Sequence, residues 1–304
     1  MESVKDQKQI DLKEILSTIW VYKNYILAIT LSVGILTFFI SLQFPDRYKS
    51  EVVLSESSGT MNQSNSNLGQ VSSIALLAGI DLSSSSQRVD MAIEMMRSFG
   101  FFKTFAEKHN ILPSLLAVDY WDKTQKEIVF DKNIYNPESN SWNNSKFAKN
   151  GVPYFQSAHK EFFKITKISI DNQTNFVRIS VSHESPELAD YWVKALVKEI
   201  NEVFKKDDIQ KAENSIAYLN EQIGKTNFIE VRNTLNNIIE DQFKLIMTAN
   251  SSEEYLFKEL SPSFVAEKKT SPNRPLIFLA SSFITLLLSS LFFIFLRFSL
   301  QEKI

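Results

Sequence analysis

The stretch Ser271-Pro-Asn-Arg-Pro-Leu-Ile-Phe-Leu-Ala-Ser-Ser-Phe283 places two prolines and an arginine directly before a long apolar run. Between Arg274 and Arg297 lie 22 residues without a charge, 275–296. At a rise of about 1.5 Å per residue this helix would be about 33 Å long, enough to cross a hydrocarbon core of about 30 Å. A buried helix of a soluble core fits this length poorly. The sequence therefore predicts a transmembrane helix over 275–296.

A second uncharged segment of the same length lies near the N-terminus, at 24–45. A cleaved signal peptide is the main alternative, but it would start nearer the terminus and end in a small-residue cleavage site. Here the run begins after 23 residues and is followed by Phe44-Pro45-Asp46-Arg47. The segment is therefore predicted to be a retained transmembrane helix.

Two such spans leave a tail at 1–23, a central domain at 46–274 and a second tail at 297–304. Both tails must then lie on the same side of the membrane. Lysine and arginine residues are more numerous before each span than after it, so the two spans favour opposite orientations. Because the first helix usually dominates and long domains translocate largely regardless of charge, we expect cytoplasmic tails. The central domain would then lie in the periplasm of a bacterium, and the protein in the inner membrane.

The composition is that of a folded protein with no electrostatic preference for nucleic acid. The chain has 304 residues, a net charge of −2 and 22% charged residues. It contains no cysteine, which excludes a disulfide framework and a thiolate metal site. A central domain of this length can hold a sizeable core without such crosslinks.

The central domain mixes strand and helix patterns, which predicts an α+β class. The segment 47–54 leaves the first span as a strand. Polar and apolar residues alternate in 163–170 and in 175–181, and the turn residues Asp171-Asn-Gln-Thr174 lie between them. This pattern predicts a β-hairpin, and hence a small sheet.

The rest of the first half of the domain is less regular. The segments 55–73 and 131–153 are rich in Ser, Asn and Gly and are expected to be loops, and the stretch 110–160 matches no pattern. An amphipathic helix is predicted between 87 and 110. Its apolar face, which we expect in the core, consists of Met91, Met95, Phe99, Phe102 and Phe105.

A long helix is predicted over about 186–247. Ser185-Pro186-Glu187 is typical of a helix start, with a capping serine and a proline at the first helical position. Near-continuous helix of about 60 residues would measure about 90 Å, too long for a compact domain of this size. The helix therefore either folds back near Gly224 or projects as a stalk. Its candidate packing residues follow coiled-coil spacing: Ile209, Ile216, Leu219 and Ile223.

No motif for catalysis stands out. Gly224-Lys225-Thr226 lacks the upstream glycine of a phosphate loop, because position 219 is leucine. The histidines at 109, 159 and 183 show no metal-ligand spacing. We therefore expect no enzyme, no cofactor and no metal site.

Two features point to anchoring instead. Proline fixes φ near −65°, so Pro272 and Pro275 would hold the domain at a set angle to its anchor, with Arg274 between them. Each span also carries small residues on one face, which are candidates for helix–helix contact in lipid. They are Thr30, Gly34, Thr37 and Ser41 in the first span and Ser281, Thr285 and Ser289 in the second.

Taken with the two spans, four short stretches make the chain resemble the polysaccharide co-polymerases, the Wzz-type chain length determinants of O-antigen assembly. The likeness covers the whole chain in architecture but only these stretches in motif. They are Ile10–Trp20 with Lys23, Tyr48–Leu54, Ser185–Ala189 and Ser271–Pro275.

The resemblance implies a periplasmic α+β domain with a long extended helix, between two transmembrane helices. It implies a ring of identical protomers that acts with the O-antigen polymerase to set the modal length of the product, without catalysis of its own. Lipid-linked polysaccharide is a further candidate partner. Two alternatives from other classes remain: a periplasmic adaptor for capsular or exopolysaccharide export, and a membrane-anchored sensor.

Overall fold

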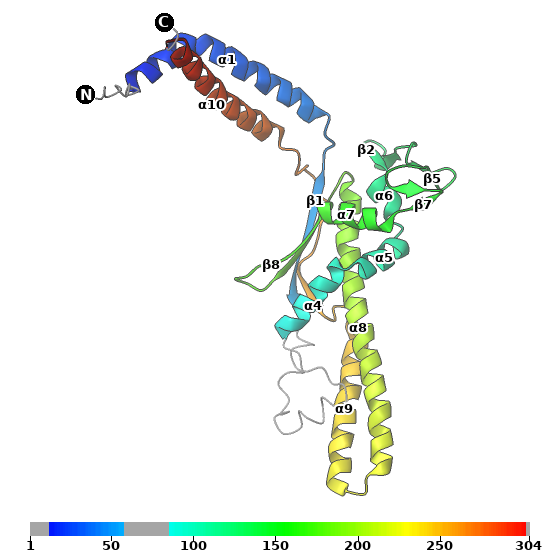
Figure 1. Cartoon of the computed structure of the whole chain (residues 1–304). Coiled ribbons are helices and arrows are strands. Elements are labelled where there is room, and N and C mark those ends of the chain that lie inside the picture. Colours follow the sequence, from blue (N-terminus) through cyan, green and yellow to red (C-terminus); the bar gives the residue numbers. More distant parts are fainter. Residues whose placement is uncertain (1–11, 58–84, 302–304) are drawn as a thin grey trace, which may run out of the picture. The chain divides into compact units, whose positions relative to one another are not determined.

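The structure, a computed structural model, describes residues 12–57 and 85–301 of the chain. It divides into two compact units (Figure 1). One consists of Met1–Asp46 with Thr270–Ile304, and the other is Arg47–Lys269.

Two long helices make up the described part of the first unit: α1 (Leu12–Leu42) and α10 (Arg274–Gln301). Each contains a stretch long and apolar enough to cross a membrane, of 27 residues in α1 and 24 in α10. Most of their Leu, Ile and Phe side chains are exposed, whereas a helix in a soluble core would bury them. α1 begins before the predicted span and ends three residues before Pro45, whose ring disfavours helical geometry in the residue before it.

The second unit is built on a four-stranded antiparallel sheet in the order β10-β1-β9-β8. β8 and β9 form the predicted hairpin, and the Asp171 carboxylate closes the turn by accepting hydrogen bonds from the N–H groups of Gln173 and Thr174 at 3.0 and 3.2 Å. The strands are β1 (Tyr48–Glu56), β8 (Thr166–Ile170), β9 (Val177–His183) and β10 (Phe257–Ser261).

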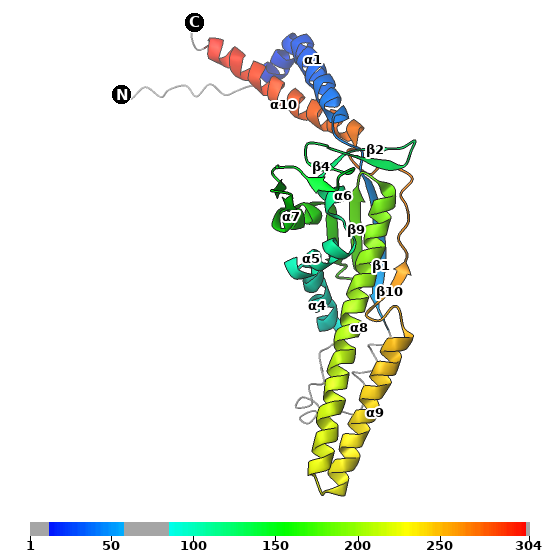
Figure 2. The same ribbon diagram turned by 90° about the vertical axis from the view of Figure 1, so that its right-hand side faces the viewer.

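One face of this sheet packs against α8 (Pro186–Lys225), which runs along it in Figure 2. Side chains of β1 alternate between buried and half-buried, so one face enters the core. α8 starts as predicted: the Ser185 hydroxyl accepts the N–H of Leu188 at 3.3 Å, and Pro186 occupies the first position. The core between the two elements contains Val52, Leu54, Ile179, Val181, Trp192, Leu196 and Ile200.

Short helices complete the core beside α8. The predicted helix at 87–110 is two helices, because Ser98 caps a new helix by accepting the N–H of Phe101 at 3.2 Å. The break shifts the phase of the apolar face, so the prediction that Met91, Met95 and Phe99 are core residues is wrong: they are 45%, 36% and 41% exposed. The helices are α4 (Ser85–Arg97), α5 (Phe99–Lys108), α6 (Leu112–Leu116) and α7 (Phe155–Ile165).

The stretch that matched no sequence pattern forms three small antiparallel strand pairs. Their turns contain residues with positive φ, among them Asn140 at 46° and Asn150 at 52°, a conformation that asparagine tolerates well. The pairs are β2 (Val118–Asp122) with β3 (Glu127–Phe130), β4 (Tyr135–Asn136) with β5 (Ser141–Trp142), and β6 (Ala148–Lys149) with β7 (Val152–Pro153). The predicted loop at 131–153 therefore contains short strands, and the one at 55–73 lies outside the described residues beyond position 57.

The segment predicted as one long helix is two helices. α8 ends at Lys225, one residue after Gly224, and α9 (Ile229–Ser251) returns beside it as an antiparallel hairpin (Figure 2). Of the two arrangements that the sequence allowed, the chain adopts the fold-back. α8 alone, with 40 residues, is about 60 Å long.

Candidate functional site

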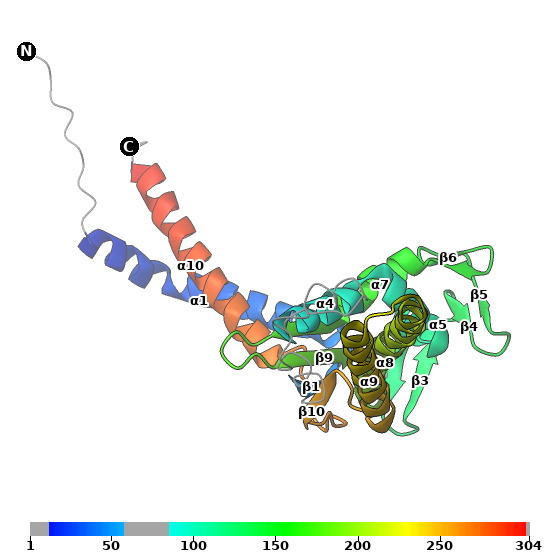
Figure 3. The ribbon, with the colours of Figure 1, turned by 90° about the horizontal axis from the view of Figure 1, so that it is seen from below.

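Three features of the chain are candidates for function: the contact between α1 and α10, the hairpin of α8 and α9, and a pocket beside the hairpin. α1 and α10 cross in the view of Figure 3. At their contact the hydroxyl oxygens of Thr37 and Ser281 lie 2.7 Å apart, within hydrogen-bond distance. A Cβ added at Gly34 would lie 2.5 Å from Ser282 Oγ and 2.9 Å from Phe278, so a larger residue here would require these side chains or the helices to shift.

The hydroxyl groups of the other predicted small residues form no hydrogen bond between the two helices among the described contacts. Thr30 donates to the carbonyl of Ile26 in its own helix, and Thr285 donates to that of Ser281, both at 2.8 Å. Ser289 likewise bonds within α10, to the carbonyl of Leu286, and the buried Ser41 contributes its carbonyl oxygen rather than its hydroxyl. Gly34, Thr37 and Ser281 of the predicted set meet directly, together with Ser282, which the sequence reading missed. The remaining four lie on the less exposed faces of the two helices, with Ser41 and Ser289 buried.

Arg274 ties the start of α10 to the end of α1. Its Nη2 lies 2.9 Å from the Asp46 carboxylate, and it donates to the carbonyls of Ser41 and Phe44 at 3.4 and 3.5 Å. These carbonyls lie at the C-terminal end of α1, where a positive charge is favoured by the helix dipole. Within the predicted proline motif, Arg274 is thus the residue that contacts the end of α1.

The two prolines of that motif lie on either side of this contact. Pro275 stands in the first turn of α10, where its missing N–H costs no hydrogen bond. Pro272 lies just before the helix, and its carbonyl accepts the N–H of Arg274 at 3.1 Å. The Asn273 side chain accepts the N–H of Leu276 at 3.3 Å and caps the helix.

A second arginine joins the opposite ends of the same helices. Arg297 donates to the hydroxyl of Thr18 at 2.9 Å, and Tyr22 stacks on Phe293 with ring centroids 4.8 Å apart. The sequence reading used Arg297 only as the end of an uncharged run. Its role was detectable in principle, since the distance from Arg274 to Arg297 matches that from Ser41 back to Thr18, each 23 residues.

The hairpin of α8 and α9 has an apolar seam of its own. Leu219 is buried with Leu235 and Ile238, and Ile223 packs against them. Of the other predicted packing residues, Ile209 packs against the main core of the domain and Ile216 is half-buried. The seam therefore holds the far part of the hairpin together separately from the sheet.

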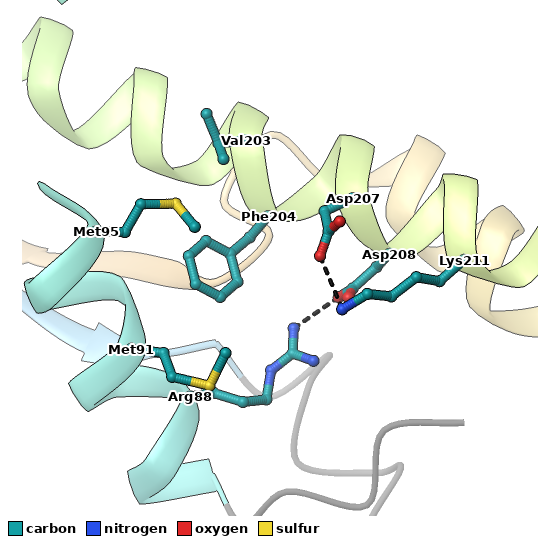
Figure 4. Close-up of a pocket in the computed structure, with 8 residues that line it drawn as sticks. All are labelled: Arg88, Met91, Met95, Val203, Phe204, Asp207, Asp208 and Lys211. Atoms are coloured by element: carbon teal, nitrogen blue, oxygen red, sulfur yellow. Dashed lines mark hydrogen bonds and ion pairs between the residues drawn. The ribbon is translucent and has the colours of Figure 1, made fainter. Parts of the chain in front are cut away.

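A charged cluster fixes the hairpin to α4 (Figure 4). The Arg88 guanidinium contacts the Asp208 carboxylate at 2.6 Å, and the Tyr255 hydroxyl donates to the same carboxylate oxygen at 2.7 Å. Burial, with the nearby negative charge of Asp208, raises the pKa of Tyr255, so the hydroxyl stays protonated and keeps donating. The sequence reading could not find this cluster, because Arg88 and Asp208 are 120 positions apart.

The pocket beside this cluster is too small for a sugar. Its volume is about 30 Å³, room for only one or two water molecules. On its rim Asp207 pairs with Lys211 at 2.9 Å, in line with the solvated acid predicted there. The lining residues, drawn in Figure 4, are Arg88, Met91, Met95, Val203, Phe204, Asp207, Asp208 and Lys211.

The three histidines have separate surroundings. His109 lies 2.8 Å from the Tyr191 hydroxyl and 3.0 Å from Glu199, and His159 lies 3.0 Å from a backbone carbonyl. His183 is buried against backbone groups. Within residues 12–57 and 85–301, no group of three or more His, Asp or Glu side chains is arranged to hold a metal ion.

Comparisons with known proteins agree with the resemblance read from the sequence. Residues 8–109 match the family model Wzz, described as chain length determinant protein, which is the family that the sequence resembles. A comparison with curated proteins found no match.

Among solved structures, one described as a full-length bacterial polysaccharide co-polymerase is similar, at 11% identity over 96% of this chain and 99% of its own, with a TM-score of 0.41. A fragment of WzzB, a polysaccharide co-polymerase from Salmonella Typhimurium, is 10% identical over 75% of this chain and 100% of its own, with a TM-score of 0.38.

Proposed function

Because its residues 8–109 place this chain with the Wzz chain length determinant family, we propose that it regulates the length of a bacterial surface polysaccharide, the lipopolysaccharide O-antigen. It acts as a non-catalytic scaffold together with the polymerase that extends the chain. The family match carries this proposal.

The proposal includes a place in the cell. α1 and α10 cross the inner membrane, residues 46–274 form a periplasmic domain, and both tails lie in the cytoplasm. Two long exposed apolar helices of one unit support this arrangement. The arginine contacts at both ends of the pair also support it, since they place charges outside the uncharged runs.

As a scaffold, the protein works as a homo-oligomer, with a ring as the expected assembly. The domain offers long exposed helix surfaces, and the pocket beside Asp208 has a volume of only about 30 Å³. An assembly of such domains would hold polymerase molecules and growing chains near one another. The polymer length then depends on assembly and anchoring, and not on a catalytic side chain.

The test is the gel ladder of surface polysaccharide from cells with and without the gene. We expect loss of the gene to leave synthesis running while a clustered length distribution becomes an unregulated one dominated by short chains. Expression of the intact protein should restore the clustering, and the variant with both Pro272 and Pro275 changed to Ala should restore it poorly. An unchanged ladder, or a complete loss of polymer, would contradict the proposal.

A further inference from the structure

The turn between β2 and β3 lies beside the point where the chain enters the second unit from α1. The Nζ of Lys123 in this turn lies 5.9 Å from the centroid of the Tyr48 ring, and Tyr48 is the first residue of β1. Figure 2 shows the strand pair at the end of the second unit where α8 begins. We call residues 120–128, the turn with the adjoining ends of both strands, the β2–β3 arm.

In the proposed arrangement this arm is within reach of the membrane surface. The Asp46 carboxylate contacts the Arg274 guanidinium at 2.9 Å, and Arg274 is the last charge before the uncharged run of α10. Because consecutive Cα atoms are about 3.8 Å apart, the Cα of Tyr48 lies within about 8 Å of that of Asp46 at any angle between the two units. A lipid headgroup layer is about 5 to 8 Å thick. The chain itself therefore keeps Tyr48, with the Lys123 turn beside it, close to the headgroups.

A turn of the same construction lies at the other end of the sheet, but its composition differs. The Asp122 carboxylate accepts the N–H groups two and three residues later at 2.7 and 3.2 Å, and Asp171 does the same between β8 and β9. Four positions after each aspartate φ is positive, at 54° for Lys126 and 57° for Asn175. The intervening residues are Lys-Thr-Gln-Lys in the first turn and Asn-Gln-Thr-Asn in the second. Of these two segments, only the one near the start of β1 carries charge.

Lys126 occupies a backbone conformation that suits asparagine better than lysine. Five non-glycine residues of the described chain have positive φ, and the other four are the asparagines at 110, 140, 150 and 175. Asparagine tolerates this region because its short polar side chain can bond locally, whereas lysine has no such compensation. A lysine in this place costs stability that asparagine would not, which points to a use of its ammonium group outside the fold.

Aromatic side chains accompany the lysines of the arm. Tyr120 is 51% exposed, and Trp121 and Ile128, which pair across the two strands, are half-buried. Tryptophan and tyrosine are enriched at membrane–water interfaces, where the ring meets the acyl boundary and its polar group stays in the headgroup layer. Three acids, at 119, 122 and 127, offset the two lysines. Local contacts, rather than a long-range attraction to anionic lipid, would therefore hold the arm.

We propose that the β2–β3 arm contacts the phospholipid headgroups of the membrane that α1 and α10 span. The ammonium group of Lys126 binds a lipid phosphate, and the Trp121 ring lies at the boundary between headgroups and acyl chains. The inference rests on the proposed spanning arrangement and adds to it a second attachment of the domain. A domain held both by its chain connections and by the arm keeps a fixed angle to the membrane.

The test uses the full chain in nanodiscs of phosphatidylethanolamine and phosphatidylglycerol that include lipids with nickel chelated on the headgroup. Because the chain has no cysteine, a single nitroxide label can be placed at Thr124→Cys in the arm. Gln173→Cys is the matched control, since both residues are exposed and each donates its backbone N–H to the aspartate of its turn. We expect nickel to speed the spin relaxation of the label several-fold more at 124 than at 173.

A substitution at Lys126 separates lipid contact from folding. Asparagine suits the positive φ, so Lys126→Asn should unfold on heating no earlier than the wild type. The same variant should reduce the nickel effect on the label at 124 at least twofold, because the ammonium group is lost. Lys126→Arg keeps the charge in the same backbone conformation and should keep the nickel effect.

Three outcomes would overturn the proposal: equal nickel effects at the two turns, an unchanged effect in Lys126→Asn, and magnetic coupling between Thr124 labels of two copies in place of the nickel effect. The last would mean that the arm contacts a second copy of the chain. A label at Leu288→Cys, a position on α10 that is 65% exposed, tests the spanning arrangement separately. If oxygen dissolved in lipid reaches that label while nickel does not affect the one at 124, only the arm contact is wrong and the proposed arrangement stands.

Discussion

At the residue scale, His183 is held between two backbone groups inside the domain. Its Nε2 lies 2.8 Å from the carbonyl oxygen of Ser114, and its Nδ1 accepts the N–H of Ser185 at 2.9 Å. The neutral ring with a proton on Nε2 satisfies both contacts, whereas a second proton on Nδ1 would face the Ser185 N–H. Burial lowers the pKa of His183, which agrees with this geometry.

The domain should therefore lose stability in mild acid. The unfolded chain has a histidine pKa of about 6.5, so below that pH it binds a proton that the folded ring resists. The free energy of unfolding is then fully retained above about pH 6.5 and falls as the pH drops through that value. We expect His183→Gln, which can keep one donor and one acceptor, to show a weaker decline than the wild type in thermal unfolding from pH 8 to pH 5. His159→Gln is the control, and an unchanged slope in the His183 variant would contradict this account.

Asp208 should matter far more for stability than its neighbour Asp207. Asp208→Asn removes the carboxylate that the buried Arg88 and Tyr255 contact, and breaking a buried ion pair costs about 3 to 5 kcal/mol. Asp207→Asn removes an exposed partner of Lys211 and should cost less than about 1 kcal/mol. Denaturant unfolding followed by circular dichroism compares the two. Equal losses would mean that the buried cluster is not what fixes α4 to the hairpin.

At the scale of elements, the hairpin of α8 and α9 should open independently of the sheet, because its seam around Leu219 is separate from the main core. Leu219→Asp places a charge in that seam. We expect faster amide hydrogen exchange in 212–245 with unchanged exchange in β1 and β9, and a shifted polysaccharide length. Tyr218→Asp, at a position that is 48% exposed, is the control. Protection of the seam in the Leu219 variant would contradict the prediction.

How well an element was predicted depended on whether its own sequence determines it. The start of α8 was predicted because Ser185 and Pro186 act locally, and the β8–β9 hairpin because its turn is closed by Asp171. The face of α4 was missed because a break at Ser98 changes the phase within one apolar pattern. The strand pairs at 118–153 are too short to show alternation, so only their packing determines them.

Some residues of the candidate site were also predicted from the sequence, and others were not. Glycine and hydroxyl residues of the two spans were found from composition, and Gly34, Thr37 and Ser281 do meet at the helix contact. Which of the small residues bond across the contact depends on how the two helices cross, so the sequence could not show that Thr30, Thr285 and Ser289 use their hydroxyls within their own helices. The cluster around Asp208 joins distant segments and left no local signal.

At the scale of the whole molecule, the proposed topology makes a direct prediction about the three regions of the chain. Reporters fused before Met1 and after Ile304 should both read cytoplasmic, because two spans return the chain to its starting side. A reporter inserted near Asn65, in the region between the spans, should read periplasmic. Paired alkaline phosphatase and green fluorescent protein fusions give opposite signals at each site and serve as mutual controls. A cytoplasmic reading near Asn65 would exclude the proposed arrangement.

The two arginine contacts of α10 have a mechanical consequence. Arg274 is fixed to the end of α1 and Arg297 to its beginning, and a helix of 24 residues between them is about 36 Å long. Sliding of either helix along the other would break a contact at one end, so these contacts oppose a piston-like movement of α10 against α1. Tilting the pair as one body is a response to a change in bilayer thickness that keeps both contacts. In a thinner membrane, the two proposed spans would then lean together while the contacts at both ends are kept.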